Sequence, residues 1–538
     1  MRRRPPAFFA VAALVLLTGS GGSCSEGRQP ETTPPPATSL PPAELRLVVV
    51  TDLDGYLEPC GCTSRPLGGI DRLAHQLATL RREGTPTLFV AAGNLLFQGA
   101  PHGSDLERAR DQERMRAETV REILDELELA AAAPGPLDFA FGAERFSALA
   151  GASRAAMLAA GARVEGSEPA PFGSVRRVRV GELDVAIVGF ADLRDASGAL
   201  PAGVAAEDPV AAGRAALEGV EADLVVALVS GDRRLARRVA GLPRVDVVVH
   251  GGDDEAEVRP PSVGEGAPIL HAGRHGRGLT VVDLRRGEGG LADASEWTRE
   301  AQRAHVRQRA EALEARIAEW ARDSSTAPAD LAAQRGRLAE LRRELDALAA
   351  PPRVEGGYLS ARHVELPPEA PQAAEFTARM RALDRRVNEH NRDIFASWMP
   401  EPAAEGAPRY VGSERCATCH AAAHTWWRGH AHGRAYATLE QRDKNFNLSC
   451  VGCHVTGYLE PGGSTVTHVG PLADVGCESC HGPGSMHASR PTAAPVNVVR
   501  APEERTCRGC HNPEHSDRFD FSTYRQMLLA PGHGLPPT

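Results

Sequence analysis

Lysine, aromatic residues and runs of like charge are scarce in this chain of 538 residues. Arginine supplies nearly all of the 61 basic residues, which we attribute to genome composition. The net charge is −9 at pH 7, and no segment concentrates basic residues. Nucleic acid is therefore not expected as a partner, because surfaces that bind it carry clustered lysine or arginine.

Long apolar segments are also nearly absent. The only one, Phe8–Leu17, is too short to cross a bilayer as a mature helix. It lies between Arg2–Arg4 and a few small residues, which is the order of an export signal over residues 1–24. Cys24 follows directly, and the arrangement resembles a lipoprotein signal whose cysteine carries a lipid anchor. Simple cleavage near this point is the alternative. In both cases we expect an exported protein, periplasmic or at the cell surface.

Cysteine is used almost entirely in one pattern. Eight of the 11 cysteines belong to four C-x-x-C-H runs in the last quarter of the chain. Such a run is typical of covalent c-type haem attachment, in which two thiols bond the haem and the histidine ligates its iron. A zinc site or a pair of disulfides needs no histidine after every second cysteine. The runs lie at Cys416, Cys419 and His420; at Cys450, Cys453 and His454; at Cys477, Cys480 and His481; and at Cys507, Cys510 and His511.

The length predicts two to four domains. Between residues 45 and 284, continuous apolar runs alternate with helical periods, which predicts a layered α/β domain with a buried sheet. The predicted fold class is multidomain: this α/β domain, a helical hairpin, and a mostly α-helical or irregular domain with four haems. The expected boundaries are 1–24 for the signal, 25–44 for a Pro-rich tether, 45–290 for the α/β domain, 295–350 for the hairpin, 351–408 for a connecting segment and 409–538 for the haem domain.

Residues 295–350 predict two helices that pair along one apolar seam. Val306, Ala310 and Ile317 recur at steps of four and seven, and Leu338 and Leu341 continue the pattern in the second half. Arginine and glutamate fill the positions between them. A structural spacer is the preferred interpretation, and a coiled coil that binds a partner is the alternative.

The residues around the C-x-x-C-H runs form a more specific pattern. After the first run, Trp427, His432, Ala435 and Leu439 fit W-x-x-x-x-H-x-x-A-x-x-x-L, and Val475–Gly484 encloses the third run in V-G-C-E-S-C-H-G-P-G. The pattern resembles the family of the tetrahaem cytochrome that accepts electrons from hydroxylamine oxidation in nitrifying bacteria. This resemblance covers about residues 409–525.

The resemblance implies iron ligands beyond the four motif histidines. It places His432 and His487 on the far faces of two haems. For a third haem, His533 is the first choice and His515 the second. The haem on Cys450 and Cys453 would keep an open face. Three further histidines are interpreted as neighbours or surface residues rather than ligands: His424, His430 and His468.

The α/β domain resembles the calcineurin-type metallophosphoesterase domain of secreted 5′-nucleotidases. Its activity depends on two metal ions that activate water. The blocks that carry the resemblance are Thr51–Tyr56, Gly68–Arg72, Ala92–Asn94, Gly135–Gly142, Val229–Gly231, Asp246–Asp254 and His271–Leu284.

Most of the metal ligands of that family are missing here. Asp52 remains, but Asp54 replaces a histidine and Asn94 replaces the bridging aspartate. Leu137 and Gly231, which stand at two further ligand positions, offer no ligating side chain. We therefore expect a non-catalytic domain that docks a partner or binds a ligand, since a fold does not by itself confer its family's activity.

Cys60 and Cys62 form a C-x-C pair directly after the first strand. The pair is too close for a relaxed disulfide. With Asp52 and Asp54 it could hold one further metal ion, or it could act as a redox couple. A pair of structural thiols or a strained disulfide is the alternative.

The sequence favours an electron-transfer protein with four covalent haems c and periplasmic or surface redox partners. Two alternatives stay open. One is a haem enzyme that reduces a small nitrogen or sulfur species at an open haem. The other is an active phosphoesterase linked to a cytochrome.

Overall fold

A computed structural model describes the chain from residue 40 onward with several gaps. Cys24, most of the tether, Cys60 and Cys62 lie outside the described part, so the predictions for them stay predictions. Within the described part, no helix has both the length and the apolar character to cross a membrane. The described residues are 40–59, 65–98, 106–252, 258–262, 266–288, 290–350, 352, 354, 356–490, 497–512, 515, 516, 518–531 and 533–535.

Two sheets form the centre of the first domain. The larger is mixed: β12 pairs antiparallel with both β1 and β14, whereas β1 to β4 run parallel. Its order is β13 (Leu291–Asp293), β14 (Gly357–Glu365), β12 (Gly278–Arg285), β1 (Leu45–Thr51), β2 (Thr87–Ala92), β3 (Leu129–Ala133) and β4 (Ala156–Met157). The smaller has the order β11 (Ile269–Leu270), β10 (Val247–Gly251), β9 (Leu224–Ser230), β7 (Leu183–Ala191) and β6 (Val175–Val180).

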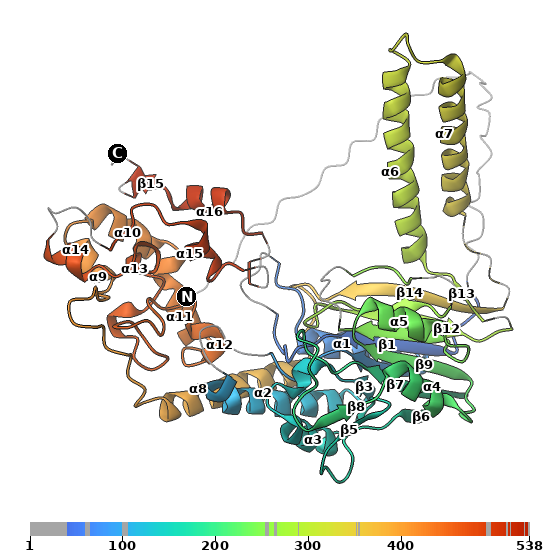
Figure 1. Cartoon of the computed structure of the whole chain (residues 1–538), viewed down its shortest axis with the longest axis horizontal. Helices are drawn as coiled ribbons and strands as arrows, with labels where there is room; N and C mark the ends of the chain where they lie inside the picture. The colour runs from blue at the N-terminus through green and yellow to red at the C-terminus, as the bar shows by residue number, and fades with distance from the viewer. Residues whose placement is uncertain are drawn as a thin grey trace, which may run out of the picture. The chain divides into compact units, whose positions relative to one another are not determined.

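The sheets pack face to face, and helices cover their outer faces. Alternate residues of β1 show why: Leu47 and Val49 belong to the cluster shared by both sheets, whereas Val48 and Val50 belong to the cluster beneath the helices. A third cluster lies between the smaller sheet and its helices. The helices are α1 (Ile70–Arg82), α2 (Leu106–Glu126), α3 (Ala143–Ala152) and α8 (Ala374–Ile394) on the larger sheet, and α4 (Pro209–Leu217) and α5 (Arg233–Ala240) on the smaller. We call these sheets and helices the front domain (Figure 1).

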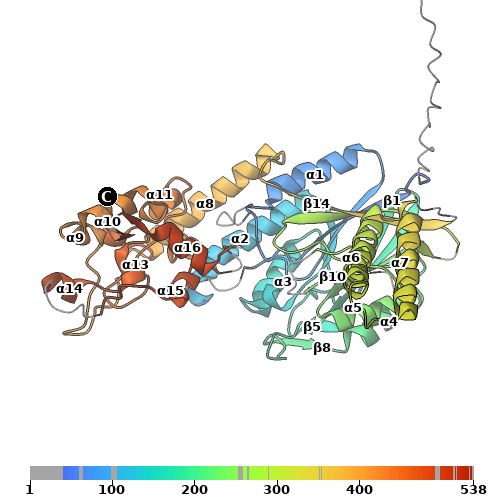
Figure 2. The same cartoon turned by 90° about the horizontal axis from the view of Figure 1, so that it is seen from above.

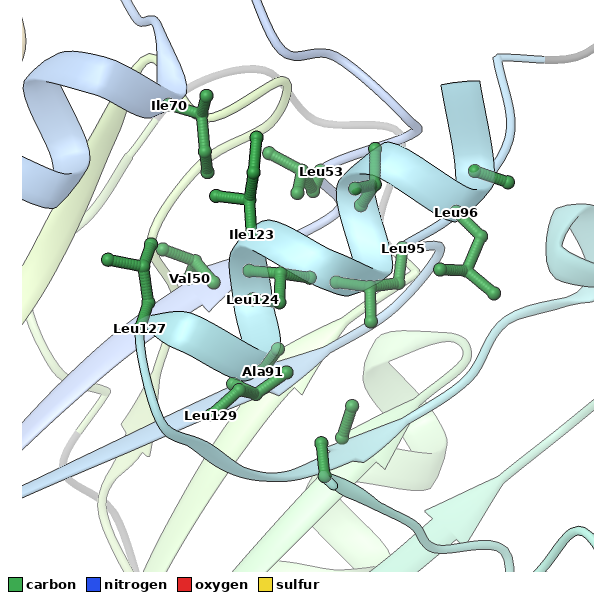
Figure 3. Close-up of a cluster of buried hydrophobic side chains, with 14 of the residues drawn as sticks. Val50, Leu53, Ile70, Ala91, Leu95, Leu96, Ile123, Leu124, Leu127 and Leu129 are labelled. Atoms are coloured by element: carbon green, nitrogen blue, oxygen red, sulfur yellow. The ribbon is translucent and has the colours of Figure 1, made fainter. Parts of the chain in front are cut away.

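The front domain is held by a large apolar core beneath α1 and α2. Ile123 and Leu124 on α2 lie over Val50 and Ala91 of the sheet (Figure 3). Burial of each such side chain contributes roughly 1.5–3 kcal/mol, which explains why the apolar periods of the sequence predicted these elements well. The helical period over 70–82 predicts a helix with the bounds of α1, and the apolar run over 45–50 predicts a strand one residue shorter than β1.

The front domain extends past the predicted boundary at residue 290. β14 lies beside β12 in the larger sheet, and Phe376 and Met380 of α8 belong to the core beneath α1 and α2. The segment 351–408 is therefore not a simple connector, because its strand and helix complete the front domain. The sequence reveals the strand but not the sheet position, which depends on pairing with a strand some seventy residues earlier.

The predicted hairpin is α6 (Glu296–Trp320) and α7 (Pro328–Ala349), inserted between β13 and β14. The two helices lie side by side in both views (Figure 1, Figure 2). Their contact is the predicted seam, with Val306, Ala310, Ile317, Leu338 and Leu341 buried. The seam uses the apolar residues of both helices.

The C-terminal domain, residues 409–538, consists of short helices joined by irregular chain, as predicted. Its only two-stranded sheet among the described residues is β15 (Ala530–Pro531) with β16 (Gly534–Leu535). β5 (Ala162–Val164) and β8 (Val204–Ala206) form a similar pair in the front domain. The helices are α9 (Ser413–Ala417), α10 (Ala421–Gly429), α11 (Ala435–Glu440), α12 (Leu448–Val451), α13 (Cys477–His481), α14 (Ser485–Ser489), α15 (Glu504–Arg508) and α16 (Phe521–Leu528). Single 3₁₀ turns are η1 (Pro136–Phe139), η2 (His432–Arg434) and η3 (Gly470–Leu472).

Candidate functional site

Each C-x-x-C-H run forms about one helical turn. In the first run the His420 amide donates to the Cys416 carbonyl at 2.9 Å, and in the fourth the His511 amide donates to the Cys507 carbonyl at 2.8 Å. Residues at i, i+3 and i+4 share one face of a helix, so both thiols and the histidine of a run point the same way. All eight motif cysteines are free of disulfides. This is the arrangement that attachment to one flat group requires.

Hydrogen bonds fix the ring orientation of several histidines. Nδ1 of His454 donates to the Ala435 carbonyl at 2.7 Å, and Nδ1 of His481 donates to the Val499 carbonyl at 2.6 Å. Nδ1 of His533 donates to the Leu528 carbonyl at 2.6 Å. A carbonyl only accepts, so these rings carry the proton on Nδ1 and leave Nε2 as the ligating nitrogen.

Three motif histidines each face one of the predicted distal histidines. The ring centres of His420 and His487 lie 6.2 Å apart. The ring centres of His432 and His511 lie 6.2 Å apart, and those of His481 and His533 also lie 6.2 Å apart. Each pair joins residues that are far apart in the sequence.

This separation matches two imidazoles on one metal. A metal–nitrogen bond is about 2.0 Å, and the ligating nitrogen lies about 1.1 Å from its ring centre, so opposite ligands place their ring centres about 6.2 Å apart. Stacked rings in direct contact lie closer; Trp426 and His533, for example, have centres 4.8 Å apart. The three pairs have the spacing of two imidazoles on one iron, and each includes a motif histidine; His250 and His271 of the front domain share the spacing but belong to no C-x-x-C-H run.

The fourth motif histidine differs. In the part of the chain that the structure describes, no second histidine ring lies at this spacing from His454. His515, the second choice for a distal ligand, lies near the Cys510 thiol of the fourth run and acts on it electrostatically. The His430 ring stacks on Trp426, as the His533 ring also does, and the His424 ring lies beside Trp427.

Contacts between thiols order the four runs in space. The Cys416 and Cys477 thiols are hydrogen-bond partners, which joins the first run to the third. The thiols of Cys453 and Cys510 are also partners, which joins the second run to the fourth. Cys480 lies close enough to Cys507 and Cys510 to interact electrostatically with both. The order is therefore first, third, fourth, second.

Glu478, inside the third run, ties this region together. Its buried carboxylate accepts hydrogen bonds from the backbone amides of Val411, Gly412 and Gly484, at distances of 2.7–3.0 Å. These amides precede the first run and the predicted ligand His487. One carboxylate thus positions both sides of the His420–His487 pair, and multiple amide donors offset the cost of its burial.

The apolar residues of the C-terminal domain fit a large bound group. Its buried apolar cluster is small and centres on Leu448, Val451 and Val466. Most of the large apolar side chains that are exposed in the described chain lie after residue 480: Met486, Val499, Met527, Leu529 and Leu535. These side chains are not covered by the polypeptide, so the domain offers apolar surface to a bound group. The residues present therefore fit covalent haem.

A second cluster of buried polar residues lies where the strands of the two front-domain sheets end. Asp52, directly after β1, accepts hydrogen bonds from the Gly252 amide at 2.8 Å and the Asn94 amide at 3.3 Å. A Cβ at Gly93 would lie 2.0 Å from Asp52 Oδ1, so this position requires glycine. Burial first, and then the carboxylate of Asp54, raise the pKa of Asp52 to about 8.

Asp54 is balanced by two basic side chains that the sequence did not single out. Arg274 Nη2 lies 3.1 Å and His275 Nε2 3.2 Å from Asp54 Oδ2. Tyr56 stacks on the His275 ring with 4.1 Å between centres. Both basic residues lie within the predicted closing segment His271–Leu284, but nothing in their spacing indicates a contact with the first loop.

These residues do not fit a two-metal centre. Among the described residues, no group of three or more histidine, cysteine, aspartate or glutamate side chains is arranged to hold a metal ion. Asn94 Oδ1 accepts a hydrogen bond from the Leu137 amide at 3.0 Å, so it is engaged with the backbone. Arg274 and His275 stand beside the carboxylate that a cation would otherwise neutralise. Asp52 and Asp54 do lie together, as predicted.

Residues 415–482 match the family of cytochrome c554 and c-prime. The chain is also 35% identical over 107 residues to cytochrome c-554 of Nitrosomonas europaea, which covers 17% of this chain and 45% of that protein. The resemblance predicted for the C-terminal domain is thus confirmed. It indicates that the C-terminal domain is similar to c-type cytochromes, which carry covalently attached haem.

Solved structures similar to the chain include a 5′-nucleotidase precursor from Thermus thermophilus. It is 18% identical, with a TM-score of 0.44, and the match covers 64% of this chain and 59% of that one. Sulfate thiohydrolase SoxB from Thermus thermophilus is 17% identical, with a TM-score of 0.42, over 65% of this chain and 62% of that one. The chain spans less than two thirds of the length of each of these relatives.

The raised pKa of Asp52 predicts how stability depends on pH. An acid whose pKa is higher in the folded chain binds its proton more tightly there. Its contribution is complete below the ordinary value of 3.8 and is lost as the pH rises through about 8. Between about pH 5 and pH 8 we expect the unfolding free energy to fall by at most about 4 kcal/mol from this group.

Asp52→Asn should flatten this dependence by about one proton in scanning calorimetry of the full chain in the presence of a chelator. The matched control is Asp330→Asn, because Asp330 is exposed on the hairpin. An unchanged slope in Asp52→Asn would show that Asp52 titrates alike in the folded and unfolded chains.

Proposed function

We propose that this chain is an exported tetrahaem c-type cytochrome that transfers electrons between periplasmic or surface partners. The observation that carries the proposal is the spacing of His420–His487, His481–His533 and His432–His511. Each pair combines a motif histidine with a predicted distal histidine at the distance of two ligands on one iron. Ligation from both faces keeps iron low-spin and favours electron transfer over substrate chemistry.

When bound, haem would supply one-electron chemistry at each of the four runs. The protein's part is to hold the ligands and to keep neighbouring sites close. The thiol contacts support a linear order in which the run at Cys416 lies at one end and the run at Cys450 at the other. Electrons would then have an entry end and an exit end.

A haem-based reductase is the second candidate function. The observation that favours it is His454, which has no histidine ring opposite it among the described residues. The haem on Cys450 and Cys453 would then offer an open face to a small nitrogen or sulfur species. Turnover of nitric oxide or hydroxylamine by the reduced protein would favour this candidate.

The front domain is proposed to dock a partner or bind a ligand rather than to hydrolyse a phosphoester. The contacts of Asp54 with Arg274 and His275 support this, because these side chains stand beside the carboxylate where a metal ion would otherwise lie. Phosphatase assays with added divalent metals should give no activity above the buffer. Lipid attachment at Cys24 and a metal or redox role for Cys60 and Cys62 remain proposals that rest on the sequence.

A redox titration of the full-length holoprotein with spin-state spectra tests the main proposal. We expect four haems per chain, three of them low-spin and one high-spin, and only the high-spin haem should bind nitric oxide. The haem count tests attachment at the four runs, and the spin states test the histidine ligands of each haem. Fewer than four haems, or four low-spin haems, would overturn the proposed arrangement.

A further inference from the structure

Lys444 is the only lysine in the chain; the other 60 of its 61 basic residues are arginines. It lies between α11 and α12, six residues before Cys450. Its side chain is 16% exposed. A buried lysine needs compensating charge, because removing an ammonium group from water is costly.

Two carboxylates from the front domain provide that charge. Lys444 Nζ pairs with the carboxylate of Glu58, in the loop after β1, and lies 3.4 Å from Asp384 Oδ2 on α8. Burial alone would lower the pKa of Lys444, but Glu58 and Asp384 outweigh it and raise the pKa, so the ammonium stays charged. We call Glu58, Asp384 and Lys444 the junction charges. With all three ionised, their net charge is −1.

The junction charges lie against the second haem motif. The Cys450 thiol is buried, and the residues that act on it electrostatically include Lys444, Asp384 and Glu58. Arg116 of α2 is also near, but its guanidinium is paired with the fully buried carboxylate of Glu113. The Arg116–Glu113 pair is neutral, whereas the three junction charges together leave a net charge of −1.

Hydrogen bonds hold the chain around Lys444 in place. Gln112 on α2 accepts from the Leu448 amide at 3.0 Å and donates to Ser449 Oγ at 3.0 Å. Asn388 on α8 accepts from the Phe446 amide at 2.7 Å. α2 and α8, which lie side by side, thus bind the segment that leads into Cys450 (Figure 2). Fixed charges in a fixed, partly dry setting act more strongly than mobile surface charges.

We propose that Lys444, Glu58 and Asp384 set the reduction potential of the haem attached at Cys450 and Cys453, and that the front domain controls this potential through Glu58. The inference rests on the proposed haem at this run. Reduction removes one positive charge from the iron. A nearby ammonium therefore favours the reduced form, and nearby carboxylates favour the oxidised form.

Glu58 links the junction to the front-domain site. It lies on the same loop as Asp54 and Tyr56, which contact His275. A ligand that displaces this loop would withdraw a carboxylate from Lys444 and raise the potential of the second haem. The front domain would then act as a sensor for the cytochrome, which gives a role to a site that lacks the residues for hydrolysis.

The test is a spectroscopic redox titration of the full-length holoprotein that follows the high-spin haem separately. Lys444→Met should lower its midpoint potential, with at least a tenfold change in the oxidised-to-reduced ratio at fixed potential, which is 59 mV for one electron. Glu58→Gln should raise the midpoint, and Lys444→Arg should restore it. Glu460→Gln, at an exposed carboxylate of the C-terminal domain, is the control and should leave it unchanged.

The outcomes separate this inference from the proposed function. Unchanged midpoints in both Lys444→Met and Glu58→Gln, with four haems and one high-spin signal intact, would overturn the inference alone. An equal shift of all four haems would also overturn it, because it would reflect a general loss of structure. If Lys444→Met does not fold, Glu58→Gln still decides, since Glu58 is partly exposed and its expected effect has the opposite sign. Absence of a high-spin signal from the wild-type protein would instead contradict the proposed function.

Discussion

Replacement of Cys477 and Cys480 by serine is expected to remove more than one haem from the purified protein and to make the C-terminal domain sensitive to protease. The third run lies in the middle of the spatial order. Cys477 contacts Cys416, and Cys480 lies beside Cys507 and Cys510. With so small an apolar cluster of its own, the domain depends on the bound groups for its core.

The matched comparison is replacement of Cys416 and Cys419 by serine. The first run lies at the end of the order, where its thiol contact joins it to the third run. We therefore expect the loss of a single haem and little change in protease resistance. Haem per protein from the pyridine haemochrome spectrum and limited proteolysis measure both effects. Loss of one haem in both variants, with equal resistance to protease, would contradict the central position of the third run.

His432→Ala is expected to convert one low-spin haem to high spin and to leave the haem count at four. Its ring centre lies 6.2 Å from that of His511, the histidine of the run at Cys507 and Cys510. Burial lowers the pKa of His432 to about 4, with His430 and His511 acting in the same direction, so the ring is neutral and able to ligate. Added imidazole should restore the low-spin spectrum, because it can replace the missing ligand.

His430→Ala is the control for this variant. His430 lies two residues away, and among the described residues no motif histidine ring lies at the ligand spacing from it. Electron paramagnetic resonance and visible spectra of the oxidised proteins compare the two variants. An additional high-spin signal in His430→Ala, or none in His432→Ala, would show that His430 rather than His432 is the ligand.

The apolar patterns predicted the elements of the front domain well, and for a physical reason. Continuous apolar strands such as β9 and amphipathic helices such as α1 bury the residues that define their period. The arrangement of the strands in two packed sheets was not predicted. Nor was the position of β14 beside β12, because strand pairing across a long insertion leaves no local signal.

Some features of the candidate sites could likewise be predicted from the sequence, and others could not. The sequence shows that Leu137 and Gly231 stand at positions where the resembled family has metal ligands. It does not show the contacts of Arg274 and His275 with Asp54. Lys444 shows the limit most clearly. In the sequence, its rarity is interpreted as genome composition, and only its burial between Glu58 and Asp384 gives it a role.

The sequence by itself determined the four runs at which we propose haem attachment. A C-x-x-C-H run brings both thiols and one ligand together within a single helical turn, so the information is complete in five residues. The tertiary structure decided which histidine faces each of them. His420 lies opposite His487, His481 opposite His533 and His511 opposite His432. The two histidines of each pair are far apart in the sequence, so only the folded chain brings them together. This pairing depends on long-range packing, including the hydrogen bonds of the buried Glu478 carboxylate, and no local sequence pattern specifies it.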